Sequence, residues 1–330
     1  EQRKALEIAL QFGWTFQEIQ ARSLDGLISM NLGDLDAARI SMLDALGLAK
    51  RTGRQAEVAI QSNNLGNVLR ERGQYQDALF YYRQALKLED AAENQEGRAY
   101  AIRNMGLTYA RMGTPEKALK LLQEALKLSQ SIGNRYNELQ TILALAEVEE
   151  QMGTDAAEAS WKIAAHLSRQ MNLPESLWRS LFGMGRVTQD KAKAELYYEG
   201  AILVVESLGG SQGQVASKYS RESLYHQALE LAYKDRDESR IFDLSERQKL
   251  RSLRDKLSSR GAANQRQITL RKAREVYQEK VFAKIFDTPE VSLNAAQMAY
   301  QSARVDFSQG RNQSFDQVVP APIELDALQS

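Results

Sequence analysis

The chain has 330 residues, of which 43% are hydrophobic, and its 43 Lys and Arg balance its 43 Asp and Glu. This length and composition favour a folded protein over a disordered one, and the balanced charge removes whole-molecule attraction to nucleic acid or to an acidic membrane. The chain has no cysteine, which excludes disulfides and a cysteine nucleophile and suits a cytoplasmic and an extracytoplasmic location equally.

A 40-residue repeat organises the first two thirds of the chain. Glycine and alanine recur at this spacing in series that share one register: Gly33, Gly73, Gly113 and Gly153; Gly26, Gly66 and Gly106; Ala5, Ala45, Ala85, Ala125 and Ala165. Residues 1–13 align with the end of a period, so we expect them to form the second helix of a truncated repeat. Residues 14–208 then hold about five periods.

Each period predicts a helical hairpin. Two stretches with helical apolar spacing flank a glycine such as Gly73, which is expected to end the first helix in a left-handed conformation. Gly66 and Gly106 lie inside the predicted first helices instead. Because they stand 12 residues before Ala78 and Ala118, they predict a close approach of the two helix axes.

These hairpins resemble the tetratricopeptide repeat (TPR) in its longer forms. The matching residues are Leu65, Gly66, Gly73, Ala78, Tyr82 and Ala85 in one period and Met105, Gly106, Tyr109, Gly113, Ala118, Leu122 and Ala125 in the next. The resemblance implies an all-α fold, a right-handed α-solenoid of TPR helical hairpins followed by a longer helical connector. It also implies that the first helices line a concave groove.

Beyond Gly209-Gly210 the period ends, while helical composition continues. We expect residues 209–258 to form a degenerate capping hairpin and residues 259–330 to form a helical connector leading to a C-terminal domain absent from this chain. The string at residues 241–253 resembles the last hairpin before the caspase-like CHAT domain of bacterial TPR-CHAT proteins. The CHAT strands and the CHAT His/Cys pair do not occur in this sequence, so no peptidase activity is implied.

The sequence shows no catalytic or cofactor-binding constellation. His166 and His226 are the only histidines, and neither has a second metal ligand three or four residues away. The glycine-rich stretch at residues 209–213 lacks the lysine of a phosphate-binding loop. Residues 240–280 carry 12 basic and 5 acidic residues, a net charge of +7 (12−5), with few aromatics among them. This composition favours a solvated helical face over a nucleic-acid site.

One face of the predicted first helices is the candidate binding site. Opposite the packing seam lie Ile60, Asn63, Asn64, Asn67 and Arg70, and one period later Tyr100, Arg103, Asn104, Leu107 and Arg111. The TPR resemblance implies that Asn64 and Asn104 hold the main chain of a bound peptide. Since the nearby arginines suit carboxylates, the expected ligand is an extended acidic segment.

The sequence therefore predicts a non-enzymatic protein-interaction and regulatory module that needs no cofactor or metal. It would bind a peptide or a partner protein in the groove, or dock on a CHAT-like effector domain and control it. The alternative is a signalling-peptide or small-effector sensor region of a transcriptional regulator, which would use the same groove. A nucleic-acid partner and a membrane span are not expected.

Overall fold

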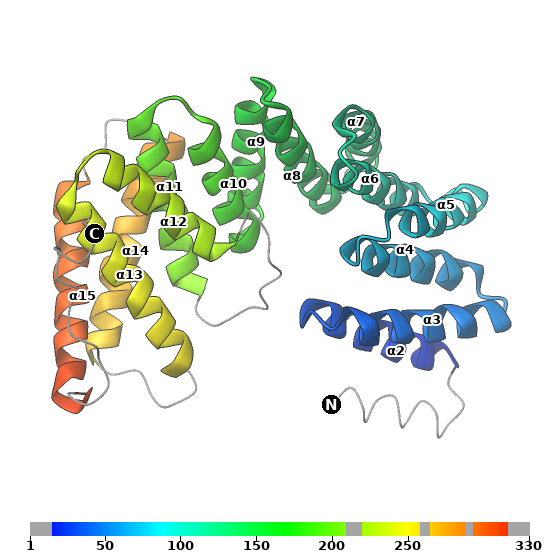
Figure 1. Cartoon of the computed structure of the whole chain (residues 1–330), viewed down its shortest axis with the longest axis horizontal. Coiled ribbons are helices and arrows are strands. Elements are labelled where there is room, and N and C mark those ends of the chain that lie inside the picture. Colours follow the sequence, from blue (N-terminus) through cyan, green and yellow to red (C-terminus); the bar gives the residue numbers. More distant parts are fainter. Residues whose placement is uncertain (1–14, 209–219, 258–264, 288–292, 316–330) are drawn as a thin grey trace. The chain divides into compact units, whose positions relative to one another are not determined.

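The computed structural model describes residues 15–208, 220–257, 265–287 and 293–315, and every regular element in these ranges is a helix. The first nine helices in Figure 1 are α2 (Thr15–Asn31), α3 (Leu35–Arg51), α4 (Gln55–Glu71), α5 (Tyr75–Ala91), α6 (Gln95–Arg111), α7 (Pro115–Ser131), α8 (Arg135–Met152), α9 (Ala156–Gln170) and α10 (Pro174–Val187). The others are α11 (Lys191–Leu208), α12 (Arg221–Lys234), α13 (Glu238–Leu257), α14 (Gln265–Phe282), the π-helix η1 (Ala283–Asp287) and α15 (Asn294–Phe315). The predicted all-α fold is confirmed.

The chain divides into two compact units. One comprises Glu1–Ala194 with Ser211–Leu224, and the other comprises Glu195–Gly210 with Tyr225–Ser330. The division therefore falls inside α11 and α12 and, between them, after Gly210, in the glycine-rich stretch at which the 40-residue period ends.

The first unit is an array of stacked hairpins. Helices α2 to α9 form four hairpins, and each helix packs against the next one along the chain, as far as α10. The first helices of neighbouring hairpins also contact one another, α2 with α4, α4 with α6, α6 with α8 and α8 with α10. Within the described residues each hairpin thus packs mainly against its neighbours, and the first helices form one continuous layer, as in a solenoid.

Left-handed residues close the helices, as the sequence predicts. Gly33, Gly73, Gly113 and Gly153 follow the first helices with φ of 83°, 76°, 75° and 66°. Between hairpins, Gly53 and Gly133 adopt the same conformation, and Glu93 fills the equivalent position with φ of 53°. A side chain in this region is strained by contact between its Cβ and the following carbonyl oxygen, so Glu93 sits where glycine fits better.

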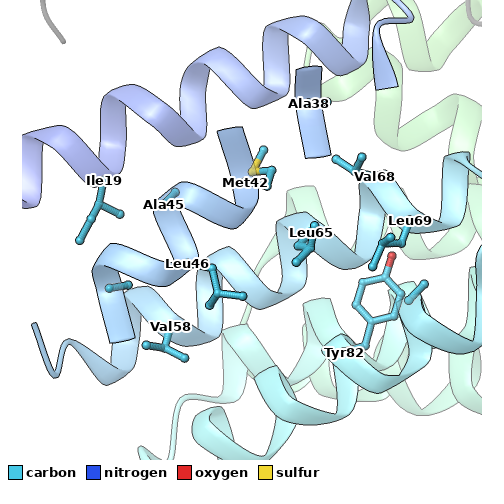
Figure 2. Close-up of a cluster of buried hydrophobic side chains, with 12 residues drawn as sticks. Ile19, Ala38, Met42, Ala45, Leu46, Val58, Leu65, Val68, Leu69 and Tyr82 are labelled. Carbon is cyan, nitrogen blue, oxygen red and sulfur yellow. The ribbon is translucent and has the colours of Figure 1, made fainter. Parts of the chain in front are cut away.

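The core of the array lies between the two layers of helices. Figure 2 shows part of it, with Ile19 of α2, Met42 of α3, Leu65 of α4 and Tyr82 of α5 packed together. The buried glycines Gly26, Gly66 and Gly106 face large side chains of the following helix.

The close approach predicted at these glycines involves a different partner. A Cβ added at Gly66 would lie 2.5 Å from Tyr82 Cε1, and one at Gly106 would lie 2.9 Å from Leu122 Cγ. The glycine therefore makes room for a bulky side chain sixteen residues later. The alanine twelve residues later contributes at Gly106, where the Ala118 carbonyl oxygen lies 3.3 Å away.

A buried ionic network joins three helices of the second unit. Arg247 of α13 donates to both carboxylate oxygens of Glu199 at 2.8 Å and to Glu206 at 2.8 and 3.3 Å, and Tyr300 of α15 donates to Glu206. Burial alone would raise the pKa of Glu206, but Arg247 outweighs it and holds the pKa below its usual value. The carboxylate therefore stays ionised beside the core formed by α11, α14 and α15.

The predicted connector is helical where the structure describes it. Helix α14 begins at Gln265, and α15 begins at Asn294. Residues 1–14, including the predicted truncated-repeat helix, and the stretches 209–219, 258–264, 288–292 and 316–330 lie outside the described residues.

Candidate functional site

The two predicted sets of site residues lie on α4 and α6, whose helices contact each other. Leu65 and Leu69 of α4 are buried against the neighbouring helices. On the opposite face, Ile60 is 44% exposed and Arg111 is also exposed, whereas Asn104 is only 4% exposed. The remaining predicted residues are half-buried: Asn63, Asn64, Asn67, Arg70, Tyr100, Arg103 and Leu107. The set is brought together, but its members are not equally open to a partner.

The two asparagines that were expected to hold a peptide join neighbouring hairpins. Asn64 Nδ2 donates to Ser23 Oγ of α2 at 3.3 Å, and Asn104 Nδ2 donates to Asn63 Oδ1 of α4 at 3.0 Å. Both bonds link a first helix to the previous first helix, because these helices lie side by side. The amide donors are thus engaged inside the array, and Asn104 is enclosed by its neighbours.

Asn67 and Arg70 hold the end of a core side chain. Tyr82 donates its hydroxyl hydrogen to Asn67 Oδ1 at 2.8 Å, and Arg70 Nη1 donates to the Tyr82 hydroxyl oxygen at 3.3 Å. Burial raises the pKa of Tyr82 to about 12, and the Arg70 charge offsets this in part, so the phenol stays neutral at physiological pH. These two predicted site residues therefore fix Tyr82 under the surface.

Glu71 neutralises two of the three arginines on this face. Arg70 Nε lies 3.3 Å from Glu71 Oε1, and Arg111 Nη2 lies 3.7 Å from Glu71 Oε2. An acidic ligand would have to compete with Glu71 for both arginines. This carboxylate, at the end of α4, weakens the expectation that all three arginines serve a ligand.

Arg103 has different surroundings. Its guanidinium carbon lies 4.8 Å from the centroid of the Tyr100 ring, and Nη1 donates to Asn137 Oδ1 of α8. No carboxylate forms an ion pair with it in the part of the chain that the structure describes. Burial lowers the pKa of Arg103, while the neighbouring tyrosines Tyr100 and Tyr136 act in the opposite direction.

The polar contacts between neighbouring first helices differ in the partner that each arginine receives. At the α2–α4 step Gln20 donates to Glu57, at the α4–α6 step Arg111 pairs with Glu71, and at the α8–α10 step Arg179 pairs with Glu147. Each of these steps contains a carboxylate. At the α6–α8 step Asn134, the residue before α8, donates to Glu96 at 2.8 Å, while Arg103 donates to the neutral amide of Asn137.

Sequence reasoning missed the extension of the surface to α2 and α8. Leu24 of α2 is 45% exposed and Tyr136 of α8 is 49% exposed. In the 40-residue register, position 20 corresponds to Ile60 and position 140 corresponds to Tyr100. Leu24 lies four residues after position 20, and Tyr136 lies four residues before position 140. The 40-residue register therefore could have located both side chains on the same face.

The described residues contain no group of three or more metal-ligating side chains. None of the helices among them has the length and apolar character needed to cross a membrane.

Comparisons with known proteins agree with this architecture. Residues 20–89 and 97–160 match the family model of the tetratricopeptide repeat, so the chain carries TPR repeats over these residues. A comparison with curated protein sequences finds no match. The resemblance to TPR-CHAT proteins stays a prediction.

Three solved structures share the fold at low sequence identity. BtubC (BKLC) from P. vanneervenii is 16% identical with a TM-score of 0.54, over 66% of this chain and 92% of that chain. A Rap protein in complex with Competence and Sporulation Factor is 13% identical with a TM-score of 0.55, over 89% of this chain and 76% of that chain. The apo form of RapI is 13% identical with a TM-score of 0.54, over 93% of this chain and 82% of that chain.

Proposed function

We propose that this chain is a non-enzymatic protein-interaction module that binds an extended segment of a partner protein across the first helices α2, α4, α6 and α8. The observation that carries the proposal is a stripe of accessible apolar and aromatic side chains on successive first helices. We call Leu24, Ile60, Tyr100 and Tyr136 the apolar stripe. A partner that covers these side chains removes their apolar surface from water, and this stabilises the complex.

The polar residues of this surface set the distances between the helices that carry the apolar stripe. The bonds from Asn64 to Ser23 and from Asn104 to Asn63 fix α2, α4 and α6 relative to one another. A partner therefore meets a preorganised surface, which lowers the conformational entropy lost on binding. In this proposal Ile60, Tyr100 and Leu107 contact the partner, and the asparagines act mainly through the array.

The fold neighbours support a binding role without identifying the partner. One of them, the Rap protein, was solved with Competence and Sporulation Factor bound. Control of a CHAT-like domain would require the same surface to respond to a partner or to that domain. A signalling-peptide or small-effector sensor would also use this surface, and the chemistry of the selected ligand distinguishes these possibilities.

The test is selection of a phage-displayed library of random 12-residue peptides on the full chain. The surface variant is Ile60→Ser with Tyr100→Ala, and the matched control is Ile40→Ser with Phe80→Ser, which changes exposed side chains of α3 and α5. Loss of two apolar contacts is expected to weaken the selected peptides about 10- to 100-fold in the surface variant.

The control variant is expected to bind the same peptides with unchanged affinity. Peptides that bind the surface variant as tightly as the wild type would place the binding site elsewhere and refute the proposal. Circular dichroism of both variants confirms that the helices are retained.

A further inference from the structure

We propose that Arg103 is the anion-binding position of this surface and takes a carboxylate from an acidic side chain of the bound partner. This inference rests on the proposed function and adds the chemistry of one position in the ligand. The sequence predicts that three arginines together favour an acidic ligand. The inference assigns this role to Arg103 alone.

The pairing of the other arginines on and beside this face sets Arg103 apart. Arg70 and Arg111 share Glu71, and Arg179 pairs with Glu147 at 2.7 Å. Arg103 contacts the Tyr100 ring and the Asn137 amide oxygen, and it forms no ion pair within the described residues. It is therefore the arginine of this face whose charge is left without a carboxylate.

A partly desolvated charge without a counter-ion is costly, and buried charges in proteins are normally paired. Arg103 is half-buried between α6 and α8, and Asn137, which receives its hydrogen bond, is fully buried. The positive charge of Arg70 acts on it as well and adds repulsion. An anion that arrives with a partner would compensate both the cost of desolvation and the repulsion.

The surroundings of the guanidinium favour a carboxylate. The Arg103 guanidinium carbon lies over the Tyr100 ring, 4.8 Å from its centroid, so the ring covers one side of the group. The remaining N–H donors lie in the plane, where they match the two oxygens of a carboxylate. A partner carboxylate would thus give Arg103 the counter-ion that Glu71 gives Arg111 and Glu147 gives Arg179.

The position of Arg103 also fits a ligand that covers the apolar stripe. Tyr100 belongs to the stripe and contacts the Arg103 guanidinium, and Tyr136 lies close enough to raise the pKa of Arg103. An acidic residue flanked by apolar residues would therefore place its carboxylate at Arg103 while its neighbours cover the two tyrosines.

The experiment repeats the peptide selection on the full chain carrying Arg103→Gln, with Arg111→Gln as the matched control. Wild type and Arg111→Gln are expected to select Asp or Glu at one fixed position of the peptide, and Arg103→Gln is expected to lose this preference. A synthetic peptide from the wild-type selection is then compared with its Glu→Gln form by calorimetry. The substitution in the peptide should weaken binding to the wild type about 10- to 100-fold and to Arg103→Gln less than about 2-fold.

The stability of the variant provides a second readout. Glutamine can still donate to Asn137 Oδ1, so Arg103→Gln is expected to keep or raise the thermal midpoint if the charge serves a ligand. A lowered midpoint would assign Arg103 a structural role and overturn the inference, as would an acidic preference that survives in Arg103→Gln. Selected peptides that depend on the apolar stripe but carry no acidic position would overturn this inference alone and leave the proposed function standing.

Discussion

The ring of Tyr82 lies so close to Gly66 that a Cβ at position 66 would come within 2.5 Å of Tyr82 Cε1. The ring cannot easily move away, because Asn67 and Arg70 hold its hydroxyl group. Glycine is thus needed at this place in the 40-residue repeat because the large side chain sixteen positions later leaves no room for a Cβ.

We expect Gly66→Ala to destabilise the protein by about 1–3 kcal/mol, because overpacking outweighs the better helix propensity of alanine. The urea midpoint measures this effect. Gly47→Ala in α3 is the control, since a Cβ there meets only the Arg51 guanidinium at 3.4 Å. The control should be neutral or stabilising by up to about 1 kcal/mol. Equal midpoints for the two variants would show that Tyr82 adapts without cost.

Replacing Gln61 by Met should stabilise the array. Gln61 of α4 is fully buried, and neither atom of its amide has a hydrogen-bond partner in the described structure. Methionine fills a similar volume without a polar group to desolvate, so a gain of about 1–3 kcal/mol is expected in urea unfolding. Gln123→Met, at an exposed position of α7, controls for general effects of the residue type. A lower midpoint for Gln61→Met would reveal a bound water or another partner of the amide.

Glu89 is expected to make stability depend on pH. Burial raises the pKa of Glu89, and the 2.7 Å hydrogen bond from Asn94 offsets this in part. Since the folded pKa lies above the unfolded value, the folded state loses stability as the pH rises above roughly 4.3. Glu89→Gln keeps an acceptor for Asn94 and removes the charge.

The Glu89→Gln variant should therefore be more stable than the wild type at pH 7 and equally stable below about pH 4. Thermal midpoints across this range measure the difference, with Glu124→Gln on the exposed side of α7 as control. A difference that does not change with pH would mean that Glu89 acts through packing alone.

Glu93→Gly should stabilise the turn between the second and third hairpins. Glu93 has φ of 53°, whereas Gly53 and Gly133 occupy the same place in the neighbouring repeats. Removing the Cβ strain should contribute about 1 kcal/mol to the free energy of unfolding. The adjacent Ala92, with φ of −90°, is the control, because glycine gains nothing there. A midpoint for Glu93→Gly at or below that of Ala92→Gly would contradict the strain argument.

The fold could be predicted because its determinants are local and repeated. Gly73 and Gly113 mark turns because glycine adopts the left-handed backbone conformation easily. Apolar spacing marks the buried seam that contains Leu65. The partner of Gly66 was mispredicted, because a pattern of small residues does not reveal which neighbouring side chain fills the space that a glycine leaves.

The candidate site could be predicted in position but not in its internal bonds. Helical periodicity brings Asn104 and Arg103 to one face, yet whether their polar groups are engaged depends on side chains of other hairpins, Asn63 for the first and Asn137 for the second. Glu71 lies outside the predicted set, although it neutralises two of its arginines. Such pairings depend on the distance between neighbouring first helices, which the sequence pattern does not specify.

The hydrogen bond from Tyr300 to Glu206 spans 94 residues of sequence, whereas contacts in the first unit join neighbouring hairpins. Local contacts form quickly and in the order of synthesis, while long-range contacts must wait for the distant segment and form more slowly. The hairpins of the first unit can therefore fold one after another during translation. The second unit completes its core only after α15 has left the ribosome. The two units of this polypeptide therefore fold at different times during synthesis.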